Sequence, residues 1–152
     1  MRQPSRMTIP RAVVAAALLA LPAFANHHHA LNGAWTLVPA DSDFHGETVL
    51  QTGTVTINDR ERNITVSRDF SYDGAASAAS YSFTTDGQEN ATVRDGKAFK
   101  SKASRKSDVL DVTTTRDGVT TVEHFSSTAS GTLMLTAEQA GHQPLTLVFH
   151  RR

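Results

Sequence analysis

The sequence predicts an all-β domain of short antiparallel strands, and three features support this prediction. After residue 30, apolar and polar residues alternate along short segments that are rich in Thr, Val, Ser and Phe. Such segments suit half-buried pleated strands. None of them sustains the i, i+3, i+4, i+7 apolar spacing of an amphipathic helix. Four Asp-Gly pairs stand between the alternating segments, and this dipeptide favours the tight type I′ turn of a β-hairpin.

Many short antiparallel strands have to protect their edges. An up-and-down β-barrel of about 8–10 strands and a β-sandwich are the two economical solutions, and alternation alone leaves both open. One Ala- and Ser-rich segment, Asp73–Ser80, is interpreted as a loop. The Asp-Gly pairs lie at 73–74, 86–87, 95–96 and 117–118. The strand candidates are Gly33–Val38, Thr48–Ile57, Asn63–Phe70, Ala79–Thr84, Ala91–Arg94, Ala98–Ser104, Val109–Thr115, Val119–Ser126, Thr132–Ala137 and Leu145–Arg151.

The residues expected to face inward form a small apolar core that Thr and Ser interrupt. Only 7% of the residues are aromatic. We therefore expect an interior that is partly polar or partly hollow. The inward candidates are Trp35, Leu37, Val55, Ile57, Ile64, Val66, Tyr81, Phe83, Val109, Val112, Val122, Leu133, Leu135, Leu145, Leu147 and Phe149.

The N-terminal segment has the three parts of a secretory signal peptide. Three arginines precede the apolar stretch Ala12–Leu21, and Ala23–Ala25 forms an A-x-A cleavage site. The apolar stretch is about half as long as the roughly 20 residues that span a bilayer. We expect residues 1–25 to be a cleaved signal, 26–31 a flexible His-containing segment and 32–152 a single barrel domain, with no integral membrane segment after cleavage.

Composition narrows the class of protein. The chain of 152 residues has 15 basic and 15 acidic residues and no cysteine. The lack of cysteine excludes disulfides, thiolate metal sites and a Cys nucleophile. Removal of residues 1–25 takes away three arginines and no acid, so the remainder has a formal charge of −3, which gives no reason to expect a nucleic-acid partner. The Ala-rich signal looks bacterial, and the expected location is the periplasm or outside the cell.

A Gly-x-Trp motif, Gly33-Ala34-Trp35, opens the first expected strand. In an exported all-β chain of this length it resembles the lipocalin (calycin) pattern and is similar to bacterial lipocalin-like secreted proteins. The resemblance implies a lipocalin-like barrel whose closed end Trp35 plugs. It also implies that Arg151 or Arg152 packs across the Trp ring and that Gly33 permits close backbone approach. Because this chain lacks the cysteine pair and the later motifs of animal lipocalins, only these structural residues carry over.

The predicted function is that of an exported binding protein for a small apolar or amphipathic ligand. A lipocalin-like barrel implies a ligand at the end opposite Trp35. Aromatic side chains in the strands nearer that end are the candidates for contact with the ligand. These candidates are Tyr81, Phe83 and Phe125.

Two alternative functions remain open. Cleavage after Ala25 would expose Asn26-His27-His28, whose α-amine, amide nitrogens and His28 imidazole suit the square plane of Cu(II) or Ni(II). His27 and His29 would be additional imidazoles, and the chain would then be a periplasmic metal-handling protein. The other alternative is an envelope structural or interaction protein without a ligand. No other cofactor is expected.

We do not expect an enzyme. The chain has no Gly-x-Ser-x-Gly, Ser-x-x-Lys, His-Glu-x-x-His or Gly-rich phosphate motif. Most of its aspartates stand in turns, where their side chains cap the backbone. Glu123 and His124 are adjacent in a strand and therefore point to opposite faces.

Overall fold

The computed structural model describes residues 30–152 apart from 47–48, 61 and 95–96, and it is all-β. No helix in this part of the chain is long and apolar enough to cross a bilayer. The elements are β1 (Gly33–Leu37), the short 3-10 helix η2 (Pro39–Asp41), β2 (Thr52–Arg60), β3 (Asn63–Tyr72), β4 (Ala75–Thr84), β5 (Asn90–Arg94), β6 (Lys97–Lys106), β7 (Val109–Arg116), β8 (Val119–Ser127), β9 (Thr132–Gln139) and β10 (Leu145–Arg151).

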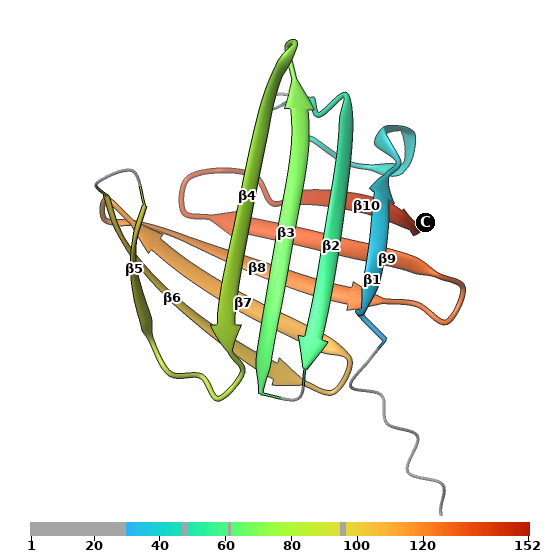
Figure 1. The fold of residues 1–152 in the computed structure, drawn as a ribbon. Coiled ribbons are helices and arrows are strands. Elements are labelled where there is room, and N and C mark those ends of the chain that lie inside the picture. Colours follow the sequence, from blue (N-terminus) through green and yellow to red (C-terminus); the bar gives the residue numbers. More distant parts are fainter. Residues whose placement is uncertain (1–29, 47–48, 61, 95–96) are drawn as a thin grey trace, which may run out of the picture.

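The strands form one antiparallel sheet that curls into a nearly closed up-and-down barrel. Each strand pairs with its neighbour in the chain except at β4 and β5, and β10 returns to pair with β1. Figure 1 shows β2, β3 and β4 crossing over β6 to β9, with β1 and β10 joining the two layers. The predicted all-β barrel is confirmed. The alternative prediction of a β-sandwich is wrong, because all the described strands belong to one hydrogen-bonded sheet.

Two of the Asp-Gly turns have the predicted geometry. Asp73 and Gly74 both have positive φ, 46° and 74°, and so do Asp117 and Gly118, 51° and 79°. Gly carries no Cβ and Asp tolerates this region, so each pair reverses the chain within two residues. At 86–87 the prediction is wrong, because only Gly87 has positive φ. The pair at 95–96 lies outside the described residues.

The interpretation of Asp73–Ser80 as a loop is wrong. The strand β4 begins at Ala75 and pairs in register with β3, from Tyr72↔Ala75 to Asn63↔Thr84. The small side chains of Ala75–Ser80 show no apolar alternation, so pattern reading missed the strand. The hairpin at Asp73-Gly74 places the segment beside β3, and backbone hydrogen bonds extend the strand.

The link from β4 to β5 runs across one end of the barrel and is held to β6. The Gly87 amide donates to the Ala103 carbonyl at 3.0 Å, and Asp86 forms an isolated bridge with Ser104. The Gln88 amide and the Thr84 hydroxyl both donate to the Asp86 carboxylate. The Gln88 bond and then the Thr84 bond lower the pKa of Asp86.

The apolar core lies inside the barrel, and most of the inward candidates are buried there. In β7 and β8 the prediction that Val109 and Val122 face inward is wrong. Leu110 and Phe125 are fully buried, whereas Val109 and Val122 are only half-buried. Tyr81 and Leu145 are partly buried and pack against the core. The largest fully buried side chains are Trp35, Phe125, Phe149, Ile57, Ile64, Leu110, Leu133, Leu135, Val55, Val66 and Val112.

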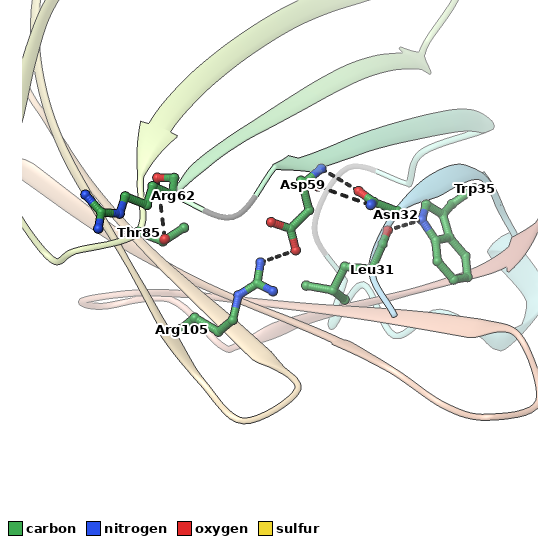
Figure 2. A network of polar contacts seen from close by, with 7 residues as sticks. All are labelled: Leu31, Asn32, Trp35, Asp59, Arg62, Thr85 and Arg105. Atoms are coloured by element: carbon green, nitrogen blue, oxygen red, sulfur yellow. Dashed lines mark hydrogen bonds and ion pairs between the residues drawn. The ribbon is translucent and has the colours of Figure 1, made fainter. Parts of the chain in front are cut away.

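Trp35 fills one end of the barrel, which we call the closed end. Its ring is fully buried and its indole N–H donates to the Leu31 carbonyl at 3.0 Å (Figure 2). The Arg151 guanidinium lies 4.3 Å from the ring centroid and donates to the Asn32 carbonyl at 2.7 Å. Gly33 has a φ of 138°, and a Cβ there would lie 2.8 Å from Arg151 Nη1. The contact of Arg151 with Trp35 and the close approach at Gly33 are therefore both present.

A second polar cluster completes the closed end (Figure 2). Asp59 is buried at the end of β2 and pairs with Arg105 of β6 across the interior. The Asn32 side chain brackets the Asp59 backbone, because its amide N–H donates to the Asp59 carbonyl at 3.2 Å and its oxygen accepts from the Asp59 amide. These contacts join Asn32, β2 and β6, which are far apart in the chain, at the closed end of the barrel.

We expect Trp35→Ala to lower the free energy of unfolding by about 3–5 kcal/mol, because it leaves a cavity beneath Arg151. The measurement is equilibrium denaturation, with the exposed Met134→Ala as the control variant. Met134 is 39% exposed, so its truncation should change stability by less than about 0.5 kcal/mol. Equal effects of the two substitutions would contradict the assignment of Trp35 as the plug.

Candidate functional site

The barrel contains a cavity of about 400 Å³ at the end opposite Trp35. We call this the open end; the β7–β8 turn at 117–118 lies there, because Arg116, Asp117 and Val119 line the cavity. Well-packed interiors contain few voids larger than a water molecule, and ligand sites usually measure about 300–1,000 Å³. The lining residues are Arg68, Tyr81, Phe83, Phe99, Thr114, Arg116, Asp117, Val119, Thr121, Glu123 and Gln139.

Strand alternation brings polar side chains into this part of the interior. In β3, Ile64 and Val66 are fully buried, and Arg68 continues the same face two residues further on. In β8, Phe125 is fully buried and Glu123 precedes it on the same face. Each of these strands thus places one charged residue beside apolar inward residues, and Phe70, two residues beyond Arg68, again packs against the core. Both charged residues, Arg68 and Glu123, line the cavity.

Arg68 and Glu123 meet across the interior in a bidentate ion pair. Arg68 Nη1 donates to Glu123 Oε1 at 2.7 Å, and Nη2 donates to Oε2 at 2.6 Å. The side chains are only 16% and 13% exposed. Paired charge-assisted bonds of this geometry are among the strongest polar contacts in proteins. The pair therefore forms a fixed polar element in the cavity wall.

Aromatic rings hold Arg68 in place. Its guanidinium carbon lies 5.7 Å from the centroid of the Tyr81 ring and 5.5 Å from that of Phe125. Tyr81 in turn stacks on Phe83 with centroids 6.2 Å apart. A guanidinium over a ring face is attracted by the ring quadrupole. Contacts with two rings and a carboxylate leave Arg68 little freedom to change its position.

A second arginine lies at the rim of the cavity. The Arg116 guanidinium lies 5.2 Å from the Phe99 ring centroid, and Arg116 Nε is 3.5 Å from Asp117 Oδ2. Lys97 Nζ approaches the same carboxylate oxygen at 3.6 Å. These charged side chains are half-exposed or more, so water screens them and each ion pair contributes about 1 kcal/mol or less.

The break in the sheet lies beside the cavity. Between β4 and β5 there are no ladder hydrogen bonds. A smaller cavity of about 90 Å³ lies next to β4, and its lining includes Ser80, Ser82 and Ser101. It shares Tyr81 and Phe83 with the larger cavity. The two cavities are therefore separated by little more than these aromatic side chains.

The structure distributes the predicted site residues between the two ends of the barrel. Tyr81 and Phe83 line the cavity. Phe125 is fully buried beneath Arg68 and is not a lining residue. Gly33, Trp35 and Arg151 lie together at the closed end. His27, His28 and His29 lie outside the described residues, as do residues 1–25, so the structure describes neither the candidate metal ligands nor the signal.

Sequence reasoning missed the Arg68–Glu123 pair. Alternation starting from Val66 and from Phe125 would have placed one charge of each sign inside the barrel. Glu123 was considered only beside His124, and the structure confirms that these two face opposite sides. His124 Nδ1 is 2.6 Å from Asp111 Oδ1 on the outer face. Within residues 30–152 as described, no group of three or more His, Cys, Asp or Glu side chains is arranged to hold a metal ion.

Comparison with solved structures supports a barrel of the fatty-acid-binding-protein type. A Schistosoma mansoni fatty acid binding protein in complex with arachidonic acid matches with a TM-score of 0.57 and 17% identity, over 83% of this chain and 98% of that chain. Secretory abundant heat soluble protein 4 from Ramazzottius varieornatus gives 0.61 and 14%, over 80% and 94%. A fatty acid transporter, REP1-NXSQ, gives 0.56 and 14%, over 80% and 96%.

These likenesses show the fold alone, an up-and-down barrel of the lipocalin-like kind that the sequence predicted. No protein-family model and no curated protein sequence matches the chain. Two of the three structures are named for the binding or transport of fatty acids, and none of the three is named as an enzyme.

We expect Glu123→Leu to lower the free energy of unfolding by about 3–5 kcal/mol, because it leaves Arg68 inside without its partner. The double variant Arg68→Met/Glu123→Leu should regain most of this loss, since no unpaired charge remains. The measurement is chemical denaturation. Glu89→Leu is the matched control, because Glu89 pairs with Lys100 at 3.1 Å on the exposed surface and should contribute less than about 1 kcal/mol. A double variant as unstable as Glu123→Leu would contradict the assignment of the pair.

Proposed function

We propose that this protein is an exported binding protein that holds one small, largely apolar ligand in the cavity at the open end of its barrel. The observation that carries the proposal is the cavity of about 400 Å³, whose lining combines aromatic side chains with polar groups. A pocket of this size with a few fixed polar groups is the usual form of a small-molecule site. The fold likeness to a fatty acid binding protein supports the same class of ligand.

The lining suits an amphipathic molecule. Tyr81, Phe83 and Phe99 provide apolar surface, and Arg68 and Glu123 provide polar groups beside it. Apolar parts of a ligand would gain about 25 cal/mol for each Å² removed from water. The polar end would then lie against the ion pair. In this proposal Tyr81 and Phe83 contact the ligand directly, and Phe125 acts by supporting Arg68.

The break between β4 and β5 is the proposed route of entry. Separation of two strands that share no ladder bonds requires few hydrogen bonds to be broken, so this seam is easier to widen than any paired one. The small cavity lined by Ser80, Ser82 and Ser101 lies along it. At the other end, the Trp35 plug and the Asp59–Arg105 pair close the barrel against entry.

Export is proposed from the N-terminal sequence. The basic segment, the apolar stretch Ala12–Leu21 and the Ala23–Ala25 cleavage site together form a secretory signal. The ligand would accordingly be one that is met in the periplasm or outside the cell.

We expect Thr121→Phe to weaken the binding of the neutral dye Nile red by at least about tenfold, because Thr121 lines the cavity and the ring would fill it. The adjacent exposed position on β8 provides the control Thr120→Phe, whose new ring points out of the barrel. The measurement is the titrated fluorescence of the dye. Equal binding by wild type and both variants would show that the dye, and the proposed ligand, does not use the cavity.

Export predicts that the mature protein begins at Asn26. Mass spectrometry of the protein purified from its own cells should show the loss of residues 1–25, and replacement of Ala23 and Ala25 by bulky residues should block cleavage. A full-length chain in the cytoplasm of those cells would overturn the proposed export.

A further inference from the structure

We infer that the cavity prefers a ligand whose buried end is uncharged, such as a hydroxyl or a primary amide, over a carboxylate of the same chain length. The inference rests on the proposed function of the cavity and specifies its ligand class. A fatty-acid carboxylate would need a cation that is free to receive it. The charges that line this cavity are already paired with one another.

The positive charge of Arg68 is neutralised within the wall. Both of its terminal nitrogens donate to the Glu123 carboxylate, one to each oxygen. A second carboxylate approaching Arg68 would be repelled by Glu123 at close range. To displace Glu123 would leave that carboxylate unpaired in a site nearly closed to water, which is strongly unfavourable.

Arg68 is also unable to turn toward an incoming anion without loss of its other contacts. The Tyr81 and Phe125 rings lie 5.7 Å and 5.5 Å from its guanidinium. A rotation that released Glu123 would also give up these cation–π contacts. The pair therefore acts as one neutral, dipolar unit and not as a movable cation.

The rest of the lining adds no net charge. Arg116 and Asp117 are the other charged residues that line the cavity, one of each sign, and they lie 3.5 Å apart at the rim. The Arg116 guanidinium is also stacked on Phe99. An anion placed at this rim would gain little, because water screens it there. An anion placed deeper would meet the neutral Arg68–Glu123 unit.

The ion pair retains hydrogen-bonding capacity that suits a neutral polar group. Each carboxylate oxygen has two acceptor sites, and each terminal guanidinium nitrogen has two hydrogens. The mutual bonds use only part of this capacity. A ligand hydroxyl can donate to Glu123 and accept from Arg68 at once, and an amide can do the same. A carboxylate has no hydrogen to donate to Glu123. Neutral polar partners are also present, since Thr121 donates to the Gln139 side chain at 3.4 Å.

The test compares three molecules of equal chain length and different head charge. We would measure how 1-dodecanol, dodecanoate and dodecylammonium displace Nile red from the wild-type protein at mildly alkaline pH, where dodecanoate is ionised and dodecylammonium is still charged. We expect dodecanol to displace the dye at a concentration at least about tenfold lower than either charged molecule. Displacement by dodecanoate at the same concentration as dodecanol, or a lower one, would overturn the inference.

A charge-removing variant isolates the role of Glu123. Glu123→Gln removes the anion that competes for Arg68, so dodecanoate should bind at least about tenfold more tightly while dodecanol changes less than about threefold. Glu89→Gln is the matched control, because it removes the same charge from the exposed surface. An unchanged preference in Glu123→Gln would overturn the assigned role of the ion pair. The comparison of the three dodecyl compounds on the wild-type protein tests the inference even if neither variant folds.

Failure of this inference differs from failure of the proposed function. If Nile red binding is insensitive to Thr121→Phe, the cavity is not the binding site and the proposed function fails. If Thr121→Phe abolishes binding but dodecanoate displaces the dye best, the cavity is the site and only the inferred head group is wrong.

Discussion

The bidentate pair between Arg68 and Glu123 is the contact around which the interior of this barrel is organised. Towards Trp35, the large inward side chains are apolar and fully buried, apart from the Asp59–Arg105 pair at the closed end. Above it, the interior opens into the cavity. Two opposite charges taken so far from water are tolerable only as a pair with good geometry. The strands β3 and β8 that carry them are held opposite each other by the whole barrel, so the position of the cavity follows from closure of the sheet.

The two ends of the barrel use similar chemistry for different results. At the closed end, Asp59 pairs with Arg105, and the Arg151 guanidinium lies over the Trp35 ring. At the open end, Arg68 also lies against an aromatic ring, that of Tyr81, but it lines the cavity. The seam between β4 and β5 has no ladder bonds, and Tyr81 lies on the β4 side of it.

Much of the fold could be predicted from the sequence because it depends on local rules. Period-two alternation located the strands, and Asp73-Gly74 and Asp117-Gly118 marked two hairpins with the expected backbone. Alternation alone does not say which inward residues meet. Arg68 and Glu123 are 55 residues apart, and they face each other only because β10 closes on β1. Tyr81 and Phe83 were found because aromatic residues in strands stand out. Charged inward residues were missed because a charge in a strand normally marks the solvated face.

The most direct test of the cavity as a ligand site is to map amide chemical-shift changes while 1-dodecanol is titrated into the full-length protein. Binding above the ion pair predicts that the largest changes occur at Tyr81, Thr121 and Glu123, while the Trp35 indole N–H, held by the Leu31 carbonyl, stays unchanged. Changes centred on Trp35, or on the outer face around His124, would contradict the assignment of the open-end cavity as the binding site.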